Sequence, residues 1–178
     1  MNFSNVIAQI PDFGRDIRVN LESVLNEEGA PGLSEVQIRG VALACAYALG
    51  SSALIEVVRA GQDESMVVAS QSAATIMAMN NVYYRSQHLL DDEELRKLPA
   101  RLRMSVIGKP GIEKVDFELM CFAVSALAGC GQCLTSHLAE LRKSGLSGEG
   151  AQSALRIASV LAAADRALRI ALTSPESR

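Results

Sequence analysis

Helical periodicity is the feature that most limits what this chain can fold into. Apolar residues recur every three or four positions over most of the chain, as at Ile17, Leu21 and Leu25, and this spacing places them on one face of a helix. Gly and Pro stand where such segments end, for instance at 29–32 and 109–111. No run alternates apolar and polar residues as a strand does. The sequence therefore predicts an all-α fold.

The expected helices follow one another with short breaks. Ser34, with Gln37 three residues later, has the spacing of a capping box and predicts a helix start. No Gly/Ser-rich or Pro-rich linker separates the helices, so residues 1–178 are expected to form one compact domain. The expected helices cover 16–26, 34–49, a short segment ending near 60, 64–88, 112–128, 130–143 and 147–172.

A weak internal repeat is visible in two stretches. Residues 42–50 (ALACAYALG) and 122–129 (FAVSALAG) each end at a glycine, followed by a break, a helix and a long Ala-rich helix. The repeated halves cover about 34–90 and 112–172. Because the matching letters are mostly Ala and Leu, chance similarity between two buried helices is an equal explanation. If the repeat is real, only the second copy carries thiols, since the first has Gly50-Ser-Ser there.

Composition and charge limit the expected partners and compartment. Charged residues make up 21% of the chain, the net charge is −3, and no Lys/Arg-rich run is present, so neither nucleic acid nor a membrane is an expected partner. The longest weakly charged stretch, 41–58, contains Gly50 and Glu56 and is expected to form two buried helix pieces. The first residues lack the basic and apolar segments of a signal peptide, so a cytoplasmic location is expected. In that reducing compartment a close cysteine pair is more often catalytic or metal-binding than structural.

The chemistry is expected at this close cysteine pair. Cys130 and Cys133 enclose Gly131-Gln132, and His137 follows one helical turn after Cys133, which places the three side chains on one helix face. A helix start near Gly131 is expected to put Cys130 in the first turn, where the helix dipole favours a thiolate. His137 can take a thiol proton or pair with a thiolate. Two thiols at this spacing can close a disulfide and so store two electrons.

Glu118 is the candidate for a third functional group. It lies at the edge of the apolar stripe of the preceding helix, between Val115 and Phe122. A carboxylate half-buried there needs a partner, and His137 is the expected one. Taken alone, a glutamate at a helix edge is more often solvated. Its spacing to the thiols favours the functional interpretation.

Two other interpretations of the cysteine pair stay open. A zinc site needs three or four ligands. The pair and the following histidine supply three, but no second pair completes the site, and His88 is expected at an exposed helix end. The pair can also be a coincidence in an Ala-rich core, although the flanking glycines are unusual for core packing. Cys45 and Cys121, among Ala, Phe and Met, are expected to fill the core.

The spacing Glu118-x11-Cys130-x2-Cys133-x3-His137 resembles the active-site signature of the AhpD family, alkyl hydroperoxidases of the carboxymuconolactone decarboxylase-like superfamily. The resemblance is weaker over the N-terminal third of the chain. Asn, Tyr and Arg side chains within the matching stretches are interpreted equally well as active-site lining, as an oligomer contact or as packing. The other matching stretches are 77–85 (MAMNNVYYR), 101–111 (RLRMSVIGKPG), and 117 to the end.

The resemblance implies a trimeric protein that reduces organic hydroperoxides and recycles an oxidised peroxiredoxin partner. Its electrons are implied to come from dihydrolipoamide on a lipoylated dihydrolipoamide acyltransferase, with no bound cofactor or metal. In this scheme Cys133 becomes a sulfenic acid, Cys130 supplies a proton and closes the disulfide, and His137 with Glu118 forms the proton relay. Members of the family can carry His where this chain has Gln132, a side chain that hydrogen-bonds but does not titrate.

The same residues serve two classes of function. The first is a thiol peroxidase that attacks hydroperoxides directly. The alternative is a disulfide-relay adaptor that reduces a partner protein and has little peroxidase activity of its own. A decarboxylase or lactone-processing enzyme of the same superfamily is not expected, because that chemistry has no evident use for a vicinal dithiol.

Overall fold

The computed structural model describes residues 3–173. Within this range the chain forms helices and no strand, which confirms the all-α prediction. The long helices begin and end within two residues of the expected positions. They are α2 (Arg15–Val24), α3 (Glu35–Leu49), α4 (Ser52–Arg59), α5 (Glu64–Leu90), α8 (Lys114–Ala128), α9 (Gly131–Lys143) and α10 (Gly148–Thr173). The short ones are α1 (Ser4–Gln9), η1 (Asp12–Gly14), α6 (Glu93–Lys97) and α7 (Ser105–Gly108).

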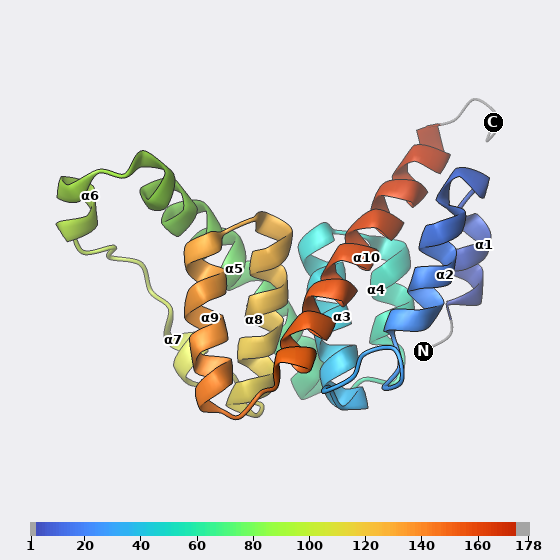
Figure 1. Ribbon diagram of the computed structural model, residues 1–178, viewed down its shortest axis with the longest axis horizontal. Coiled ribbons are helices and arrows are strands. Elements are labelled where there is room, and N and C mark those ends of the chain that lie inside the picture. Colours follow the sequence, from blue (N-terminus) through green and yellow to red (C-terminus); the bar gives the residue numbers. More distant parts are fainter. Residues whose placement is uncertain (1–2, 174–178) are drawn as a thin grey trace.

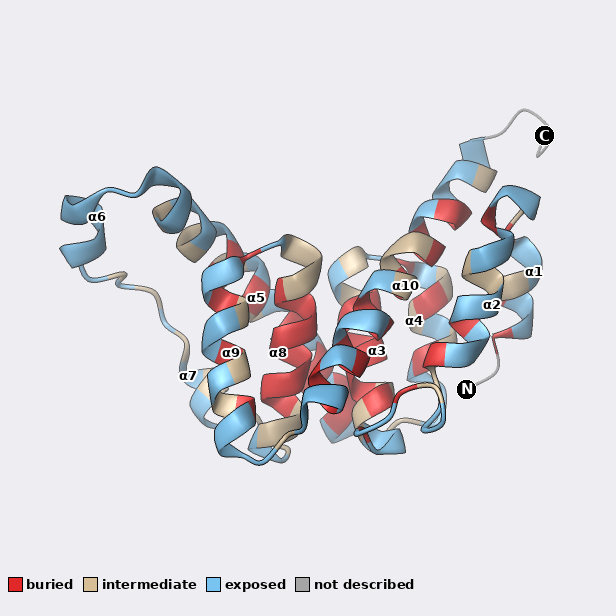
Figure 2. Cartoon of the chain, viewed as in Figure 1, coloured by how far each residue is buried: buried red, intermediate tan, exposed pale blue. Residues whose placement is uncertain are grey.

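Helices α3 and α8 form the centre of the fold (Figure 1). Helix α3 packs against α5, α8 and α10, and α8 packs against α5, α9 and α10. Buried residues concentrate in these two helices and in the adjoining part of α10 (Figure 2). Small side chains such as Ala42, Ala44 and Ala123 let helices approach closely. Cys45 on α3 and Cys121 on α8 are both buried, which confirms that they fill the core.

The two central helices end in the same way. Gly50 after α3 and Gly129 after α8 are both left-handed, with φ of 67° and 65°, a conformation that glycine adopts at little cost. In each case the N–H groups of the glycine and of the next residue donate to carbonyls of the last helical turn. Ser51 and Cys130 then occupy equivalent places, as the N-caps of α4 and α9. The parallel fits the proposed repeat, which stays a prediction.

The end of α5 projects from the body together with α6 (Figure 1). We call residues 86–98 the arm; Figure 2 shows that it is mostly exposed. His88 is exposed, as predicted, and so are Leu89, Leu90 and Leu98. In the described range, 3–173, no helix combines the length and the apolar character that crossing a membrane requires.

Candidate active site

The cysteine pair lies at the start of α9. Cys130 is the N-cap residue of α9 and not part of its first turn, so the predicted position is wrong by one residue. The reason is that two residues separate the helices: Gly129 is the C-cap of α8, and Cys130 is the N-cap of α9. Cys130 and Cys133 form a disulfide, with Cα atoms 5.3 Å apart. The Cys133 N–H donates to Cys130 Sγ at 3.3 Å, a contact that in the reduced protein would favour a thiolate at Cys130.

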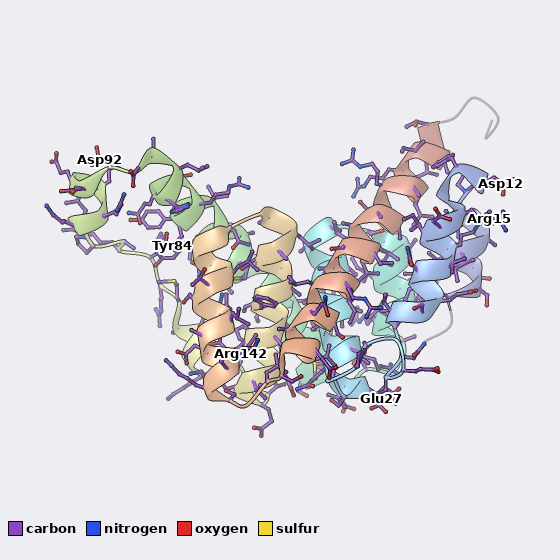
Figure 3. The ribbon with its side chains drawn as sticks, in the orientation of Figure 1. Asp12, Arg15, Glu27, Tyr84, Asp92 and Arg142 are labelled. Carbon is purple, nitrogen blue, oxygen red and sulfur yellow. A yellow bond between two sulfur atoms is a disulfide. The ribbon has the colours of Figure 1, made fainter. Side chains whose placement is uncertain are left out.

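Of the two cysteines in the disulfide, only Cys133 lines a surface pocket. Cys130 is 0% exposed, whereas Cys133 is 5% exposed and lines a pocket of about 440 Å³. Helices α5, α7, α8 and α9 surround this pocket, and Tyr84 lies on the part of α5 that runs past α9 toward the arm (Figure 3). The pocket is lined by Asn80, Tyr84, Met104, Ile107, Lys114, Glu118, Gln132, Cys133, Ser136, His137 and Glu140.

The structure brings Glu118 and His137 together. His137 Nδ1 lies 2.7 Å from Glu118 Oε2, and the two residues are 8% and 3% exposed. Glu118 is therefore buried and not half-buried as expected, because α7 and α9 both pack on α8. When Glu118 is ionised it accepts the Nδ1–H hydrogen bond, which leaves Nε2 as the basic nitrogen of a neutral imidazole.

The other ring nitrogen of His137 faces a methionine. Nε2 lies 3.3 Å from Met77 Sδ, and Ser125 Oγ donates to the same sulfur at 3.5 Å. Within residues 3–173, no hydrogen bond joins the His137 ring to either cysteine sulfur. Proton transfer between Cys133 and His137 therefore requires the Cys133 side chain to move when the disulfide opens, or a bridging water.

Helix α5 forms one wall of the site. The sequence assigned no definite role to the residues of α5 that lie there. The main-chain carbonyl oxygen of Asn80 lies 3.9 Å from Cys133 Sγ. Arg85 donates a hydrogen bond to the carbonyl of Ala128, the last residue of α8. This bond ties α5 to the turn that leads into Cys130. The resemblance over 77–85 was the only sequence signal that pointed to these residues.

Charged residues stand at the rim of the pocket. Lys143 Nζ and Lys114 Nζ lie 2.6 Å and 3.6 Å from the carboxylate oxygens of Glu140. The hydrogen bond and charge of Lys143, with a smaller effect of Lys114, lower the pKa of Glu140. Glu140 is thus ionised at neutral pH, and two lysines share one carboxylate at the rim. In the described part of the chain, no cluster of three or more His, Cys, Asp or Glu residues is placed to hold a metal ion.

The four cysteines are expected to differ sharply in reactivity. Burial raises the pKa of the Cys45 thiol to about 12, and burial together with the charge of Glu118 raises that of Cys121 as well. Thiolate is the reactive form, so iodoacetamide at neutral pH should modify Cys133, which lines the pocket, in the reduced native protein and spare Cys45 and Cys121. Mass spectrometry checks this, with urea-unfolded protein as the control that takes up four labels. Native labelling of Cys45 would contradict its burial.

Comparison with known proteins places this all-helical disulfide protein in a family. A family model described as carboxymuconolactone decarboxylase family matches residues 93–173, which include α8, α9 and all of α10. Several proteins named alkyl hydroperoxide reductase AhpD are similar over most of the chain. One from Coxiella burnetii (strain Dugway 5J108-111) is 50% identical over 157 residues, 86% of this chain and 89% of the relative.

Two further relatives cover still more of the chain. The AhpD protein of Hyphomonas neptunium is 46% identical over 172 residues, 94% of each chain. That of Brucella anthropi is 42% identical over 177 residues, 97% of this chain and 99% of the relative. The chain belongs to the AhpD family, as the sequence resemblance predicted.

Proposed function

We propose that this protein is an alkyl hydroperoxide reductase that reduces organic hydroperoxides through the Cys130–Cys133 pair. The observation that carries the proposal is the placement of Cys133, which is bonded to Cys130 and lines one pocket with the buried Glu118–His137 pair. The relatives that cover most of this chain bear the name alkyl hydroperoxide reductase. The protein is thus an enzyme, a peroxide-reducing oxidoreductase.

The reaction begins with the reduced pair. The Cys133 thiolate attacks the terminal oxygen of the hydroperoxide, the O–O bond breaks, and the alkoxide takes a proton to leave as an alcohol. Cys133 is then a sulfenic acid. Cys130, whose thiol proton went to the alkoxide, attacks this sulfur as a thiolate. The departing hydroxide takes up the proton first removed from Cys133 and leaves as water, and the disulfide forms. A dithiol donor returns two electrons and two protons to the pair. The net reaction converts one hydroperoxide and one dithiol into an alcohol, water and a disulfide.

The pocket divides the roles of the two thiols. Cys133 is the residue of the pair that lines the pocket, and Cys130 is buried behind it, so we assign peroxide attack to Cys133 and disulfide closure to Cys130. Cys130 is also the proton donor to the alkoxide. His137, held by Glu118 at 2.7 Å, serves as the base that takes the Cys133 proton. Gln132 lines the same pocket and can hydrogen-bond there without transferring protons.

For the electron donor, we propose dihydrolipoamide on a lipoylated dihydrolipoamide acyltransferase, and for the oxidised partner, an AhpC-like peroxiredoxin. Cys133 is only 5% exposed, so a dithiol on the thin, flexible side chain of a lipoyl-lysine should reach it better than a folded protein does. We expect a lipoylated domain to reduce the disulfide roughly tenfold faster than a folded dithiol protein such as thioredoxin at equal thiol concentration. Stopped-flow kinetics with each donor measures this. Equal rates would remove the support for a lipoyl donor.

The alternative, a disulfide-relay adaptor, makes a different prediction about the partner. With dihydrolipoamide present and the peroxiredoxin omitted, a peroxidase continues to consume cumene hydroperoxide. An adaptor consumes almost none until the peroxiredoxin is added. Because Cys133 faces a pocket large enough for a small organic molecule, we expect consumption without the partner.

We also propose that the protein is a cytoplasmic homotrimer. The exposed leucines of the arm are apolar surface that association can bury; they are Leu89, Leu90, Leu95 and Leu98. Leu89→Glu together with Leu90→Glu is expected to shift the mass in analytical ultracentrifugation from trimer to monomer. Val19→Glu, on an equally exposed valine of α2, is the control and should leave the mass unchanged. A trimer that survives the leucine changes would place the interface elsewhere.

A further inference from the structure

Two neighbouring asparagines of α5 are buried without their full complement of hydrogen bonds. Asn80 and Asn81 are 4% and 2% exposed. The Oδ1 atom of Asn80 and both polar atoms of the Asn81 carboxamide have no hydrogen-bond partner. Leaving a buried amide unpaired costs about 1–3 kcal/mol relative to a paired one. Packing alone therefore gives no reason for an amide at either position.

The two asparagines differ in what they face. Asn80 lines the pocket that also contains Cys133 and His137, whereas Asn81 is not among the residues lining it. The main-chain carbonyl of Asn80 lies 3.9 Å from Cys133 Sγ, which fixes the residue next to the reacting sulfur. Asn80 thus combines an incompletely paired carboxamide with a place at the reaction centre, and Asn81 is its natural control.

The other buried polar groups of the pocket are already engaged. Glu118 Oε2 and His137 Nδ1 bond to each other, and His137 Nε2 faces Met77 Sδ. A hydroperoxide presents one O–H donor and two acceptor oxygens. A carboxamide presents an N–H donor and a carbonyl acceptor, and rotation about its Cβ–Cγ bond is soft enough to turn either end toward the pocket. The chemistry of Asn80 therefore matches the hydroperoxide group.

We propose that the Asn80 carboxamide binds the hydroperoxide group of the substrate and holds its terminal oxygen against Cys133 Sγ. This inference rests on the proposed peroxidase function. The unpaired Asn80 Oδ1 accepts the O–H of the hydroperoxide, and the carboxamide N–H donates to the oxygen that leaves as the alcohol, where negative charge develops as the O–O bond breaks. The terminal oxygen and its hydrogen pass to sulfur as the sulfenic acid. The alkoxide takes its proton from a thiol, so Asn80 neither gains nor loses one.

The test compares Asn80→Leu with Asn81→Leu in the full-length protein. Each change replaces an incompletely paired amide with an apolar side chain of similar size, so stability should stay level or rise. For Asn80→Leu we expect kcat/KM for cumene hydroperoxide to fall roughly 10- to 100-fold. Reduction of its Cys130–Cys133 disulfide by dithiothreitol should keep the unmodified rate. For Asn81→Leu both rates should be unchanged.

Each outcome decides the role of Asn80. An Asn80→Leu protein with normal peroxide kinetics overturns the proposal. The proposal is also overturned if the rate of peroxide reduction, the rate of disulfide reduction by dithiothreitol and the thermal stability of Asn80→Leu all fall together, because a purely structural residue behaves in this way. Should the leucine variant not fold, Asn80→Ala is measured in the same way and judged by the same criteria. If the unmodified protein reduces no hydroperoxide, the proposed function itself fails, and that result is distinct from the effect of Asn80.

Discussion

Replacing Cys133 with Ser is expected to abolish hydroperoxide reduction, with a loss of roughly 10³-fold or more, as for removal of other catalytic nucleophiles. Serine fits the site, but its hydroxyl does not ionise near neutral pH and no thiolate is left to attack the O–O bond. Consumption of cumene hydroperoxide with dihydrolipoamide as donor measures the effect. Circular dichroism should show an intact helical fold, because the capping bond of α9 uses the main-chain N–H of residue 133, which serine keeps.

The matched variant is Cys130→Ser, which should complete one step and then stop. We expect one equivalent of hydroperoxide to be consumed and a stable sulfenic acid on Cys133, which dimedone traps for mass spectrometry. The structure gives each thiol one advantage. Cys130 Sγ accepts a hydrogen bond from an N–H at the start of α9, whereas Cys133 lines the pocket. Dimedone on Cys130 in the Cys133→Ser protein, with none on Cys133 in the Cys130→Ser protein, would reverse the assigned roles.

The second large effect is expected at the buried carboxylate. Glu118→Gln keeps the shape of the side chain but removes the charged acceptor that orients the His137 imidazole. We expect hydroperoxide reduction to slow by about 10²- to 10⁴-fold, the usual contribution of a general base. His137→Ala should be similarly slow and also less stable, by about 3–5 kcal/mol, because it leaves Glu118 buried without its partner.

Glu140→Gln is the control for this effect. Glu140 lines the same pocket and pairs with Lys143 and Lys114 at the rim. Exposed ion pairs of this kind contribute little, and within the described residues the Glu140 side chain has no hydrogen bond to His137 or the thiols, so the rate should change little. Iodoacetamide labelling of Cys133 at neutral pH provides an independent reading and should slow in Glu118→Gln but not in Glu140→Gln. Unchanged labelling and turnover in Glu118→Gln would show that the Glu118–His137 pair plays no part in activating the thiol.

The long helices were predictable because the sequence signals that mark them lie within a few residues of each other. The apolar spacing around Leu21 and the capping box at Ser34 act within a few residues, and both appear where expected. The short helices α1 and α7, of six and four residues, were not predicted, since such segments are too short to show a period. Cys130 was placed one residue too far into α9, because the sequence does not show which residue of Gly129-Cys130-Gly131 ends the preceding helix.

The site was predictable only along α8 and α9. Glu118 and His137 lie nineteen residues apart on helices joined by a tight turn, so their spacing brings them face to face. Asn80 is separated from Cys133 by fifty-three residues and Met77 from His137 by sixty. Nothing in the periodicity of α5 shows which of its faces meets α9. Met77 has the sequence pattern of an ordinary core residue. Helix α7, which packs on α8 and contributes Ile107 to the pocket, is a helix that the sequence did not reveal.

The most direct test of the central claim is one turnover of the reduced protein with stoichiometric cumene hydroperoxide, followed by thiol counting and peptide mass mapping. The chain has four cysteines. We predict that two thiols disappear, that the loss maps to a Cys130–Cys133 disulfide with one equivalent of alcohol formed, and that dihydrolipoamide restores both. Zinc is measured on the same sample. Four thiols that persist in the presence of hydroperoxide, with stoichiometric zinc bound, would contradict the account and identify the pair as a metal site.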